Sequence, residues 1–263
     1  MSETGISFTA RIPNRQTGDG MTEANELKGK VAVVTGGSGV IGGAIIQSLQ
    51  NAGAHVFSLD LAKPPSPGIP WVNCNMRDDR SVAEAVAEVV RQQGRVDLAL
   101  HAAGVSRDAV VWKLSVEDWD LVQSVNLRGA FLLIRHVVPV MREKRRAGRI
   151  VLIGSINGSR GKFGTSAYSA SKAGLLGLAK SVAREVSSFG VLVNVVEPGW
   201  VRTPLTEMVP QKVREAALAE SLVGSFIDPE DVAAAVLYLC GSAGKRVTGQ
   251  ILRVDGGQFL GPT

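Results

Sequence analysis

A tyrosine and a lysine four residues apart carry the strongest chemical signal in this chain. Tyr168 and Lys172 belong to Y-S-A-S-K-A-G-L-L-G-L-A, a run of small residues and leucines that predicts a helix. Residues four apart on a helix lie on the same face, one turn from each other. A nearby ammonium favours the phenolate and lowers the pKa of a phenol, which can then exchange a proton with an alcohol or carbonyl oxygen.

Ser155 could add a hydrogen bond to the same oxygen. It follows the apolar run R-I-V-L-I-G, which predicts a strand, so its hydroxyl would lie in the loop after that strand. The alternative is a surface Tyr and Lys that share a helix face by chance, because this pairing is common. A catalytic site is favoured only because other parts of the chain indicate a bound cofactor.

Strands and helices alternate along most of the chain, and no internal repeat or second domain is visible. We expect strands near residues 30–36, 55–60, 71–76, 96–101, 149–154, 191–199 and 250–257. We expect helices near residues 44–53, 78–93, 119–146, 168–179 and 229–240. This alternation predicts α/β architecture with a doubly wound, Rossmann-like parallel sheet, helices on both faces and right-handed crossovers.

The turn between the first strand and the first helix has the chemistry of a phosphate site. Gly37, Gly39 and Gly42 fit the spacing G-x-G-x-x-G. Such glycines let backbone N–H groups approach a pyrophosphate, which then lies at the positive end of the helix. The motif is weak alone, because glycine turns without ligands are frequent, but its place between a strand and a helix is the required context.

Asp60, at the end of the second strand, indicates which dinucleotide would bind. A carboxylate there can accept hydrogen bonds from both adenosine ribose hydroxyls and would repel a 2′-phosphate. Gly39 and Leu61, where a basic residue could hold that phosphate, are neutral, although Lys63 lies close by. We therefore favour NAD over NADP. Without the glycines, Asp60 would be interpreted as a turn residue that ends a strand.

Composition argues against several other classes of protein. A chain of 263 residues, 45% hydrophobic and 20% charged, can form one large packed domain. The net charge of +5 comes from scattered basic residues, so we expect no nucleic-acid partner. The three histidines and two cysteines are too widely separated to indicate a metal site. No apolar run is long enough to span a membrane, and no membrane partner is expected.

Residues 1–26 differ from the rest of the chain. They are polar and rich in glycine and threonine, and they lack the apolar centre of a secretory signal. We expect a flexible N-terminal tail over 1–26 and one NAD(P)-binding domain over 27–263. Cys74 and Cys240 are expected to be small core residues of a reduced, cytoplasmic protein.

Taken together, the motifs between about residues 27 and 260 resemble the short-chain dehydrogenase/reductase family, in its shorter, single-domain branch. The resemblance implies an NAD(P)-dependent oxidoreductase acting on CH–OH groups. The family's catalytic tetrad maps onto Asn126 in V-N-L-R-G-A-F, Ser155 in I-G-S, and Tyr168 and Lys172 in Y-S-A-S-K. The segment P-G-W-V-R-T resembles the loop over the nicotinamide, and V-T-G-Q-I-L-R-V-D-G-G resembles the last strand.

The resemblance implies a role for each member of the tetrad. Tyr168 would take the hydroxyl proton in oxidation and return it in reduction, while Ser155 stabilises the developing oxyanion. Lys172 would lower the pKa of Tyr168 and hydrogen-bond the nicotinamide ribose. Asn126 would hold a water that connects Lys172 to solvent, and its alternative is a polar residue that kinks a helix.

The cofactor contacts come from turns and loops after the strands. Besides Tyr168 and Lys172, the expected cofactor-binding residues are Gly36, Ser38, Gly39, Val40, Ile41, Asp60, Leu61, Asn75, Met76, Ala102, Ala103, Gly104, Pro198, Gly199, Val201 and Thr203. We expect no metal ligands.

Three positions depart from the family pattern. Val40 replaces the middle glycine of the phosphate loop, and T-G-G-S-G-V-I-G instead resembles the loop of the longer, epimerase-like branch. His101 begins H-A-A-G where the family has N-N-A-G; we expect it to replace an Asn that ties strand to loop, although a His there could be catalytic. Asn75 stands where an Asp often contacts adenine, and its amide can make a similar bond.

The substrate signal is thinner. The stretch 103–119 resembles reductases of 3-oxoacyl thioesters carried on acyl-carrier protein or coenzyme A. In the basic segment 141–146, Arg146 matches a carrier-docking arginine of that group, but Phe189 replaces its second basic residue. The alternative for this segment is a solvated helix end near its negative dipole. A preference for NAD would suggest oxidation of a hydroxy compound.

Residues 204–226 are expected to form a mobile lid over the substrate. Met208, Val209, Leu218 and Leu222 could line an apolar pocket there, or could be helix packing. We also expect a homotetramer, because the helices at 119–146 and around Tyr168 are apolar enough to pair across a two-fold axis.

Two other functions stay open. One is a sugar or secondary-alcohol dehydrogenase of the same family. The other is a non-catalytic protein that senses a dinucleotide, although such proteins usually lose the Tyr or the Lys, and both are present here.

Overall fold

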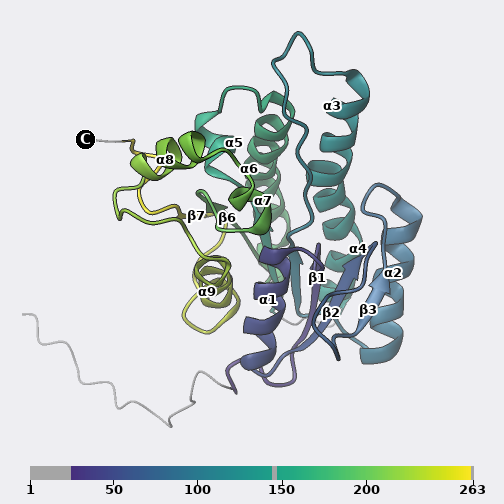
Figure 1. Cartoon of the computed structure of the whole chain (residues 1–263). Coiled ribbons are helices and arrows are strands. Elements are labelled where there is room, and N and C mark those ends of the chain that lie inside the picture. The colour runs from purple at the N-terminus through teal and green to yellow at the C-terminus, as the bar shows by residue number, and fades with distance from the viewer. Residues whose placement is uncertain (1–24, 144–146, 262–263) are drawn as a thin grey trace, which may run out of the picture.

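A computed structural model describes residues 25–143 and 147–261 (Figure 1). In this part of the chain, parallel strands form a seven-stranded sheet in the order β3-β2-β1-β4-β5-β6-β7. The strands are β1 (Val31–Thr35), β2 (His55–Asp60), β3 (Trp71–Asn73), β4 (Leu98–His101), β5 (Arg149–Ile153), β6 (Leu192–Pro198) and β7 (Ile251–Val254). The predicted doubly wound, Rossmann-like parallel sheet is confirmed.

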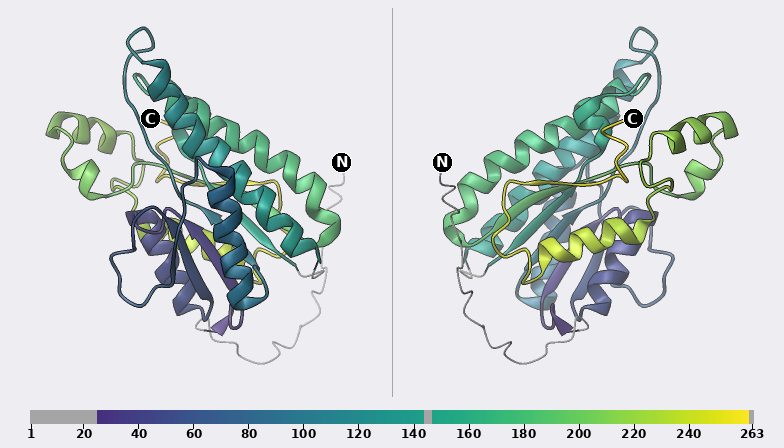
Figure 2. Two further views of the ribbon diagram at one scale, coloured as in Figure 1. Left: turned by 90° about the vertical axis from the view of Figure 1, so that its right-hand side faces the viewer. Right: turned by 90° about the vertical axis from the view of Figure 1, so that its left-hand side faces the viewer.

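Helices cover both faces of the sheet (Figure 2). They are α1 (Val40–Asn51), α2 (Asp79–Gln93), α3 (Val116–Gln123), α4 (Gly129–Glu143), α5 (Ile156–Arg160), α6 (Ser166–Val186), α7 (Pro204–Glu207), α8 (Gln211–Ala219) and α9 (Pro229–Cys240). The α1 and α9 helices pack against each other on one face, while α2, α4 and α6 cover the other. Except between β2 and β3, which a loop joins, each pair of consecutive strands is therefore connected by helices that pack on a face of the sheet.

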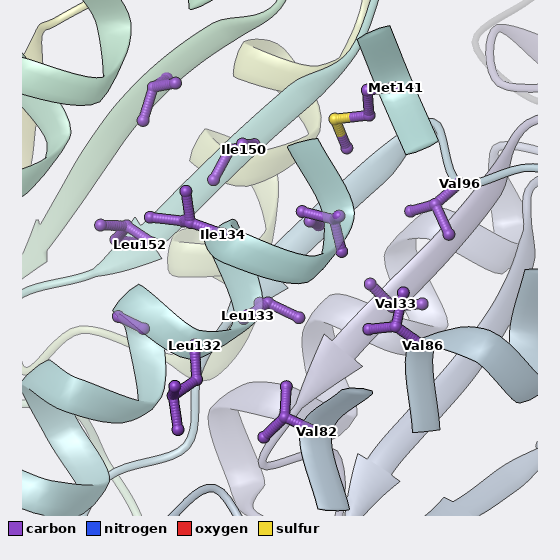
Figure 3. Packing of buried hydrophobic residues seen from close by; sticks show 14 of the residues in the cluster. Val33, Val82, Val86, Val96, Leu132, Leu133, Ile134, Met141, Ile150 and Leu152 are labelled. Atoms are coloured by element: carbon purple, nitrogen blue, oxygen red, sulfur yellow. The ribbon is translucent and has the colours of Figure 1, made fainter. Parts of the chain in front are cut away.

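Two apolar clusters, one on each face, hold these layers together. Strand β1 contributes to both, because successive side chains of a strand point to opposite faces. Val31 and Val33 face α2, α4 and α6, while Ala32 and Val34 face α1 and α9. Figure 3 shows the first cluster, in which Val33 lies near Val86. All five residues of β1 are buried, which explains its unbroken apolar sequence.

Two helices lie almost where they were predicted, and both begin after a capping residue. The predicted helix at 78–93 is α2, whose N-cap Asp78 accepts a hydrogen bond from Arg80 N and whose C-cap Gly94 is left-handed, at φ +66°. The predicted helix at 229–240 is α9, which begins with Pro229 after a capping box formed by Asp228 and Asp231.

The predicted long helix at 119–146 differs from the observed one in its start and in its regularity. Helix α3 begins at Val116, because Ser115 caps it by accepting a hydrogen bond from Asp118 N. A π-helical segment, η2 (Ser124–Arg128), then joins α3 to α4. Residues 144–146 lie outside the described residues, as do residues 1–24 of the predicted tail.

The predicted lid, residues 204–226, contains the short helices α7 and α8 and projects from the rest of the molecule (Figure 2). The buried Gln258 ties it to the loop after β6: its Nε2 donates to Ala217 O at 2.8 Å, and its Oε1 accepts from Trp200 N at 2.6 Å. Arg160 adds an ion pair with Glu220 at 2.8 Å. This segment is thus fastened at Ala217 and Glu220 to the C-terminal segment and to α5.

Among the described helices, none has both the length and the apolar character needed to cross a membrane. The same part of the chain has no group of three or more potential metal-ligating side chains. Cys74 and Cys240 are both free and buried, as expected for core residues. Burial raises the pKa of their thiols to about 11 and about 12, so neither is a reactive thiolate.

Candidate active site

The candidate residues gather at the edge of the sheet where the strands end. Because all the strands are parallel, the residues that follow β1, β2, β4, β5 and β6 meet at one edge. Strand β1 pairs with β2 on one side and with β4 on the other, so the chain reverses its direction of travel through the sheet between them. Dinucleotides bind in the crevice at such a switch point.

The glycine turn after β1 has the shape that a pyrophosphate needs. Gly36 has φ +70°, and a Cβ there would lie 2.5 Å from Ala103 N, so only glycine lets the two loops approach. A Cβ on Gly42 would lie 2.1 Å from Gly36 O. The N-cap of α1 is Gly39, which has no side chain to accept hydrogen bonds from the first turn. The backbone N–H groups of that turn can therefore donate to a bound anion.

Val40 does not close this turn. It is the first residue of α1 and its side chain is 42% exposed. The departure from the family's glycine therefore leaves the turn open, and the helix end fits an anion. Ile41, the next residue, is partly buried and packs against the cluster under α1.

Asp60 lies beside the glycine turn. Its Oδ2 accepts from Ser38 N at 3.0 Å and from Ser38 Oγ at 2.6 Å. Leu61 is exposed, and Lys63 lies with its Nζ over the Trp71 ring, 5.4 Å from the centroid. A carboxylate oxygen can accept more than one hydrogen bond, so Asp60 keeps acceptor capacity for a ribose.

The other predicted cofactor residues lie in the loops after β3 and β4. Asn75 Oδ1 accepts from Arg77 N at 3.0 Å, so its amide oxygen is engaged in a local turn. The Met76 side chain is buried in the core, so a cofactor contact there would use its backbone. Ala102, Ala103 and Gly104 follow β4 directly and face the glycine turn, as the contact between Gly36 and Ala103 shows.

The loop after β6 begins with Pro198 and Gly199. A Cβ on Gly199 would lie 2.4 Å from Gln258 Oε1, so glycine lets the loop pack on the C-terminal segment. Val201 is buried and forms a bridge with Ile227. Thr203 caps α7 by accepting from Thr206 N at 3.2 Å, so its hydroxyl is engaged within its own turn.

The structure brings Ser155, Tyr168 and Lys172 together. Ser155 is the buried N-cap of α5, where its Oγ accepts from Asn157 N at 3.2 Å, and its hydroxyl hydrogen-bonds the phenol of Tyr168. Lys172 lies one turn further along α6, with Nζ 5.5 Å from the centroid of the Tyr168 ring. The three side chains can therefore address one bound oxygen.

The ionisation of this cluster differs from the expectation that Lys172 lowers the pKa of Tyr168. Although Tyr168 is partly exposed as a residue, burial of its phenol raises its pKa, the bond from Ser155 acts in the opposite sense, and Asp108 raises it further. Lys172 instead donates to Ile153 O at 2.8 Å, and burial lowers its pKa to about 8. The amine is therefore poised near neutral pH, but its charge is directed to a carbonyl rather than to the phenol.

Asn126 lies within the π-helical segment η2 and is fully buried. Its Oδ1 accepts from Val105 N at 2.8 Å, and its Nδ2 donates to Val105 O and Ser171 Oγ, both at 3.0 Å. A Cβ on Gly104 would lie 3.4 Å from Lys172 Nζ and 3.5 Å from Asn126 Oδ1. Asn126 thus joins the loop after β4 to the turn of α6 that carries Lys172.

His101 was expected to tie strand to loop, and it instead ties β4 to β1 and to η2. The fully buried ring contacts Thr35 Oγ1 through Nδ1 at 3.0 Å and Asn126 O through Nε2 at 3.1 Å. Burial, assisted by the charge of Lys172, lowers the pKa of His101 to about 3. The ring therefore stays neutral and is a structural link between β1, β4 and η2.

Sequence reasoning missed several partners in this cluster. Ile153 contributes only a main-chain carbonyl, which leaves no side-chain signature. Ser171 and Thr35 position Asn126 and His101 through contacts across 45 and 66 residues of chain. Ser171 could have been predicted as a site residue, because it lies beside Lys172 in the helix motif.

A Rossmann-like sheet with the Ser155, Tyr168 and Lys172 cluster beside a glycine turn fits a nicotinamide-dependent oxidoreductase that acts on CH–OH groups. Residues 37–258 match the profile of a family described as enoyl-(acyl carrier protein) reductase. The chain is 39% identical over 246 residues to the 3-oxoacyl-(acyl-carrier-protein) reductase FabG of Thermotoga maritima, covering 89% of this chain and 99% of that protein.

Two further comparisons agree. The chain is 41% identical over 232 residues to the acetoacetyl-CoA reductase of Synechocystis, covering 88% of this chain and 96% of that protein. A solved structure described as the crystal structure of gox2181 matches with a TM-score of 0.86 and 31% identity, covering 90% and 98% of the two chains. The chain belongs to the short-chain dehydrogenase/reductase family, which confirms the resemblance.

Proposed function

We propose that this protein interconverts 3-oxoacyl and 3-hydroxyacyl thioesters, with Tyr168 as the group that transfers the proton. The observation that carries the proposal is the hydrogen bond between Ser155 and Tyr168, one helical turn from the buried Lys172. Relatives named as reductases of 3-oxoacyl-carrier and acetoacetyl-CoA substrates support the thioester class.

The proposed mechanism keeps Tyr168 and Ser155 in their expected roles and gives Lys172 and Asn126 different ones. When bound, the nicotinamide supplies or accepts the hydride. Tyr168 donates its proton to the carbonyl oxygen in reduction, and Ser155 donates a hydrogen bond to the same oxygen. Lys172, whose pKa is about 8, can exchange the replacement proton near neutral pH. Asn126 holds the turn of α6 beside Lys172 through Ser171.

An absorbance assay at the NADH band tests this function. NADH oxidation is followed with acetoacetyl-CoA and acetoacetyl-carrier protein, and NAD reduction is followed with a sugar panel and secondary alcohols. We expect turnover with at least one thioester. Turnover with sugars or simple alcohols alone would contradict the thioester proposal and favour a sugar or secondary-alcohol dehydrogenase. Tight NADH binding without any turnover would favour a dinucleotide sensor.

We also propose that the preferred cofactor is NAD, held by the predicted cofactor residues. Asp60 is fixed by two hydrogen bonds from Ser38, so its carboxylate is oriented before a ribose arrives. A 2′-phosphate would meet this negative charge, while Leu61 offers no positive charge. The Lys63 ammonium lies over the Trp71 ring, which supports the same preference.

Asp60→Ala tests the cofactor preference. We expect kcat/KM with NADH to fall about tenfold, the equivalent of about 1.4 kcal/mol, because a charged hydrogen-bond acceptor is lost. The value with NADPH should rise, because the repulsion is removed. Steady-state kinetics with both cofactors check this, with Asp79→Ala as the control, since Asp79 is an exposed carboxylate on α2 paired with His136. A wild-type enzyme faster with NADPH would reverse the assignment.

The choice between coenzyme A and acyl-carrier protein rests on one described position. Arg146, the predicted docking arginine, lies outside the described residues. Phe189, which replaces the second basic residue, lies under the Arg142 guanidinium, with 4.8 Å from Cζ to the ring centroid. A cation is therefore present beside Phe189, so either carrier could be used.

The lid favours an apolar substrate tail. Met208 is 76% exposed, and Leu218 and Leu222 are also exposed, so these side chains are not explained by helix packing in the protein chain alone. Val209 is partly buried. Covering exposed apolar side chains with an acyl chain removes their surface from water, which stabilises the complex.

We propose a homotetramer whose pairs meet through α4 and α6. A groove of about 590 Å³ on this face is lined by Asp120, Gln123, Ser124, Leu127, Arg128, Phe131 and Leu178. Phe131, which lines this groove, is 44% exposed. An exposed apolar patch of this kind is expected where two copies meet around a two-fold axis.

Sedimentation equilibrium tests the assembly. We expect the wild-type protein to sediment as a tetramer and Phe131→Glu to sediment as a smaller species, because a buried carboxylate would lack a partner. A wild-type monomer at micromolar concentration would refute the proposal.

We propose one NAD(P)-binding domain over 27–263, preceded by the tail at 1–26. Its support is that every described strand joins a single sheet. The free thiols of Cys74 and Cys240 support the cytoplasmic location that was expected.

A further inference from the structure

Glu197 is a fully buried carboxylate next to the candidate site. It lies in β6, directly before Pro198 and the loop that follows the strand. Its Oε1 accepts from Ser159 Oγ at 2.6 Å, and its Oε2 pairs with Arg253 Nε at 3.1 Å. The carboxylate thus joins three elements, α5, β6 and β7, that are distant in sequence.

Ser159 belongs to the same short helix that Ser155 begins. Helix α5 has five residues, which is too short for a helix to hold its own orientation. Ser155 caps its start and Ser159 lies one turn later. Whatever fixes Ser159 therefore also fixes the direction of the Ser155 hydroxyl.

Two glycines let α5 fit between β6 and α6. A Cβ on Gly154 would lie 3.2 Å from Glu197 Cγ, so the stem of Glu197 packs beside the residue that precedes Ser155. A Cβ on Gly158 would lie 2.8 Å from Ala173 N and 3.0 Å from Lys172 Cβ. The helix is thus in close contact with Glu197 and with the turn of α6 that carries Lys172.

Arg253 supplies the charge that lets Glu197 stay buried. Its guanidinium lies over the Phe259 ring, 3.6 Å from the centroid, which restricts where it can move. A buried carboxylate without a partner would be strongly destabilising, and both oxygens of Glu197 have one.

We propose that Glu197 is a positioning residue that, through Ser159, sets the direction of the Ser155 hydroxyl toward the Tyr168 phenol. This rests on the proposed roles of Ser155 and Tyr168. Hydrogen bonds to charged acceptors are short and directional, so the bond from Ser159 can hold a one-turn helix in place. A misplacement of about 1 Å at reacting groups can cost about 100-fold in rate.

Ser159→Ala is the direct test, because it removes the hydroxyl while leaving Glu197 paired with Arg253. We expect kcat to fall about tenfold or more, with the Kd for NADH and the substrate KM nearly unchanged. Ser159→Thr keeps a hydroxyl and should recover most of kcat. Ser242→Ala is the matched control, since Ser242 Oγ also donates to a carboxylate, Glu26 Oε1, at 2.6 Å, and its kcat should equal that of the wild type.

Hydrogen–deuterium exchange gives a readout that does not need the substrate. The amides of residues 156–160 should exchange faster in Ser159→Ala and at the wild-type rate in Ser242→Ala. If the wild-type protein reduces no thioester, the proposed function fails, while the exchange experiment still decides whether the bond holds α5. Wild-type kcat and wild-type exchange in Ser159→Ala would overturn the positioning role, as would a loss of NADH affinity equal to the loss of kcat.

Discussion

Tyr168→Phe should lower kcat about 1,000-fold while the Kd for NADH stays within experimental error. The change removes one oxygen and keeps the ring, so it deletes the proposed proton donor with little change in shape. Positioned general acid–base groups contribute about 100-fold to 10,000-fold in rate, which sets the size of the expected loss. Hydride transfer without a proton for the carbonyl oxygen would leave an alkoxide that only Ser155 could stabilise.

The chain offers a matched control for this substitution. It contains two tyrosines, and the other, Tyr238, is 44% exposed on α9. Tyr238→Phe should keep wild-type kcat. NADH oxidation measures turnover, and quenching of tryptophan fluorescence measures cofactor binding. A Tyr168→Phe enzyme with near-normal turnover would show that another group donates the proton.

The folded state of Tyr168→Phe should resemble the wild type. Because burial raises the pKa of Tyr168, the phenol is neutral near pH 7 and its loss leaves no unpaired charge. The bond with Ser155 is lost, and Ser155 Oγ keeps its contact with Asn157 N. A far-UV spectrum and thermal unfolding should therefore change little, so the loss of rate can be assigned to chemistry.

Local patterns explain which parts of the fold could be predicted. Strand β1 is an unbroken apolar run because both of its faces are buried. Helices α2 and α9 begin directly after Asp78 and Asp228, which are their N-cap residues. Each of these signals lies within a few residues of the element it defines. The alternation of strand and helix then predicted the doubly wound parallel sheet, and the order of its strands came from the structure.

Tertiary contacts explain what could not be predicted. The π-helical segment η2 surrounds Asn126, whose side chain reaches Val105 and Ser171 across 21 and 45 residues. The pair between Glu197 and Arg253 spans 56 residues. No periodicity in the sequence reports such pairings, and the family match identified Asn126 without its partners.

The direction in which the pKa of Tyr168 shifts could not be predicted from the sequence for the same reason. Helical spacing correctly placed Lys172 one turn from Tyr168, but spacing does not say where the ammonium points. The amine donates to Ile153 O, a main-chain group on another element. Burial is then the main influence on the pKa of the phenol, and it raises that pKa.

Lys172→Met is the second prediction with a large effect, and it separates catalysis from stability. We expect kcat to fall at least about 100-fold, because the variant loses the group that would resupply the proton of Tyr168. Lys180→Met, on the exposed face of the same helix, should keep wild-type kcat. NADH oxidation at saturating substrate measures both variants.

The stability of Lys172→Met should depend on pH in a defined direction relative to the wild type. Burial lowers the pKa of Lys172 from 10.5 to about 8 in the folded protein. Below pH 8 the amine is protonated in both states, and the full cost of burying the ammonium opposes folding. Between about pH 8 and 10.5 only the unfolded chain keeps the proton, so the free energy of unfolding of the wild type rises with pH.

Urea unfolding of both proteins at several pH values between 7 and 10.5 isolates this effect, because other titrating groups are common to the two chains. The difference between 10.5 and about 8 corresponds to a gain for the wild type of about 3 kcal/mol relative to Lys172→Met across this window. Lys180→Met should show no such change against the wild type, since Lys180 is exposed in the folded protein. A difference between wild type and Lys172→Met that stays constant with pH would mean that Lys172 keeps its ordinary pKa in the fold, and it could then not exchange a proton with Tyr168 near neutral pH.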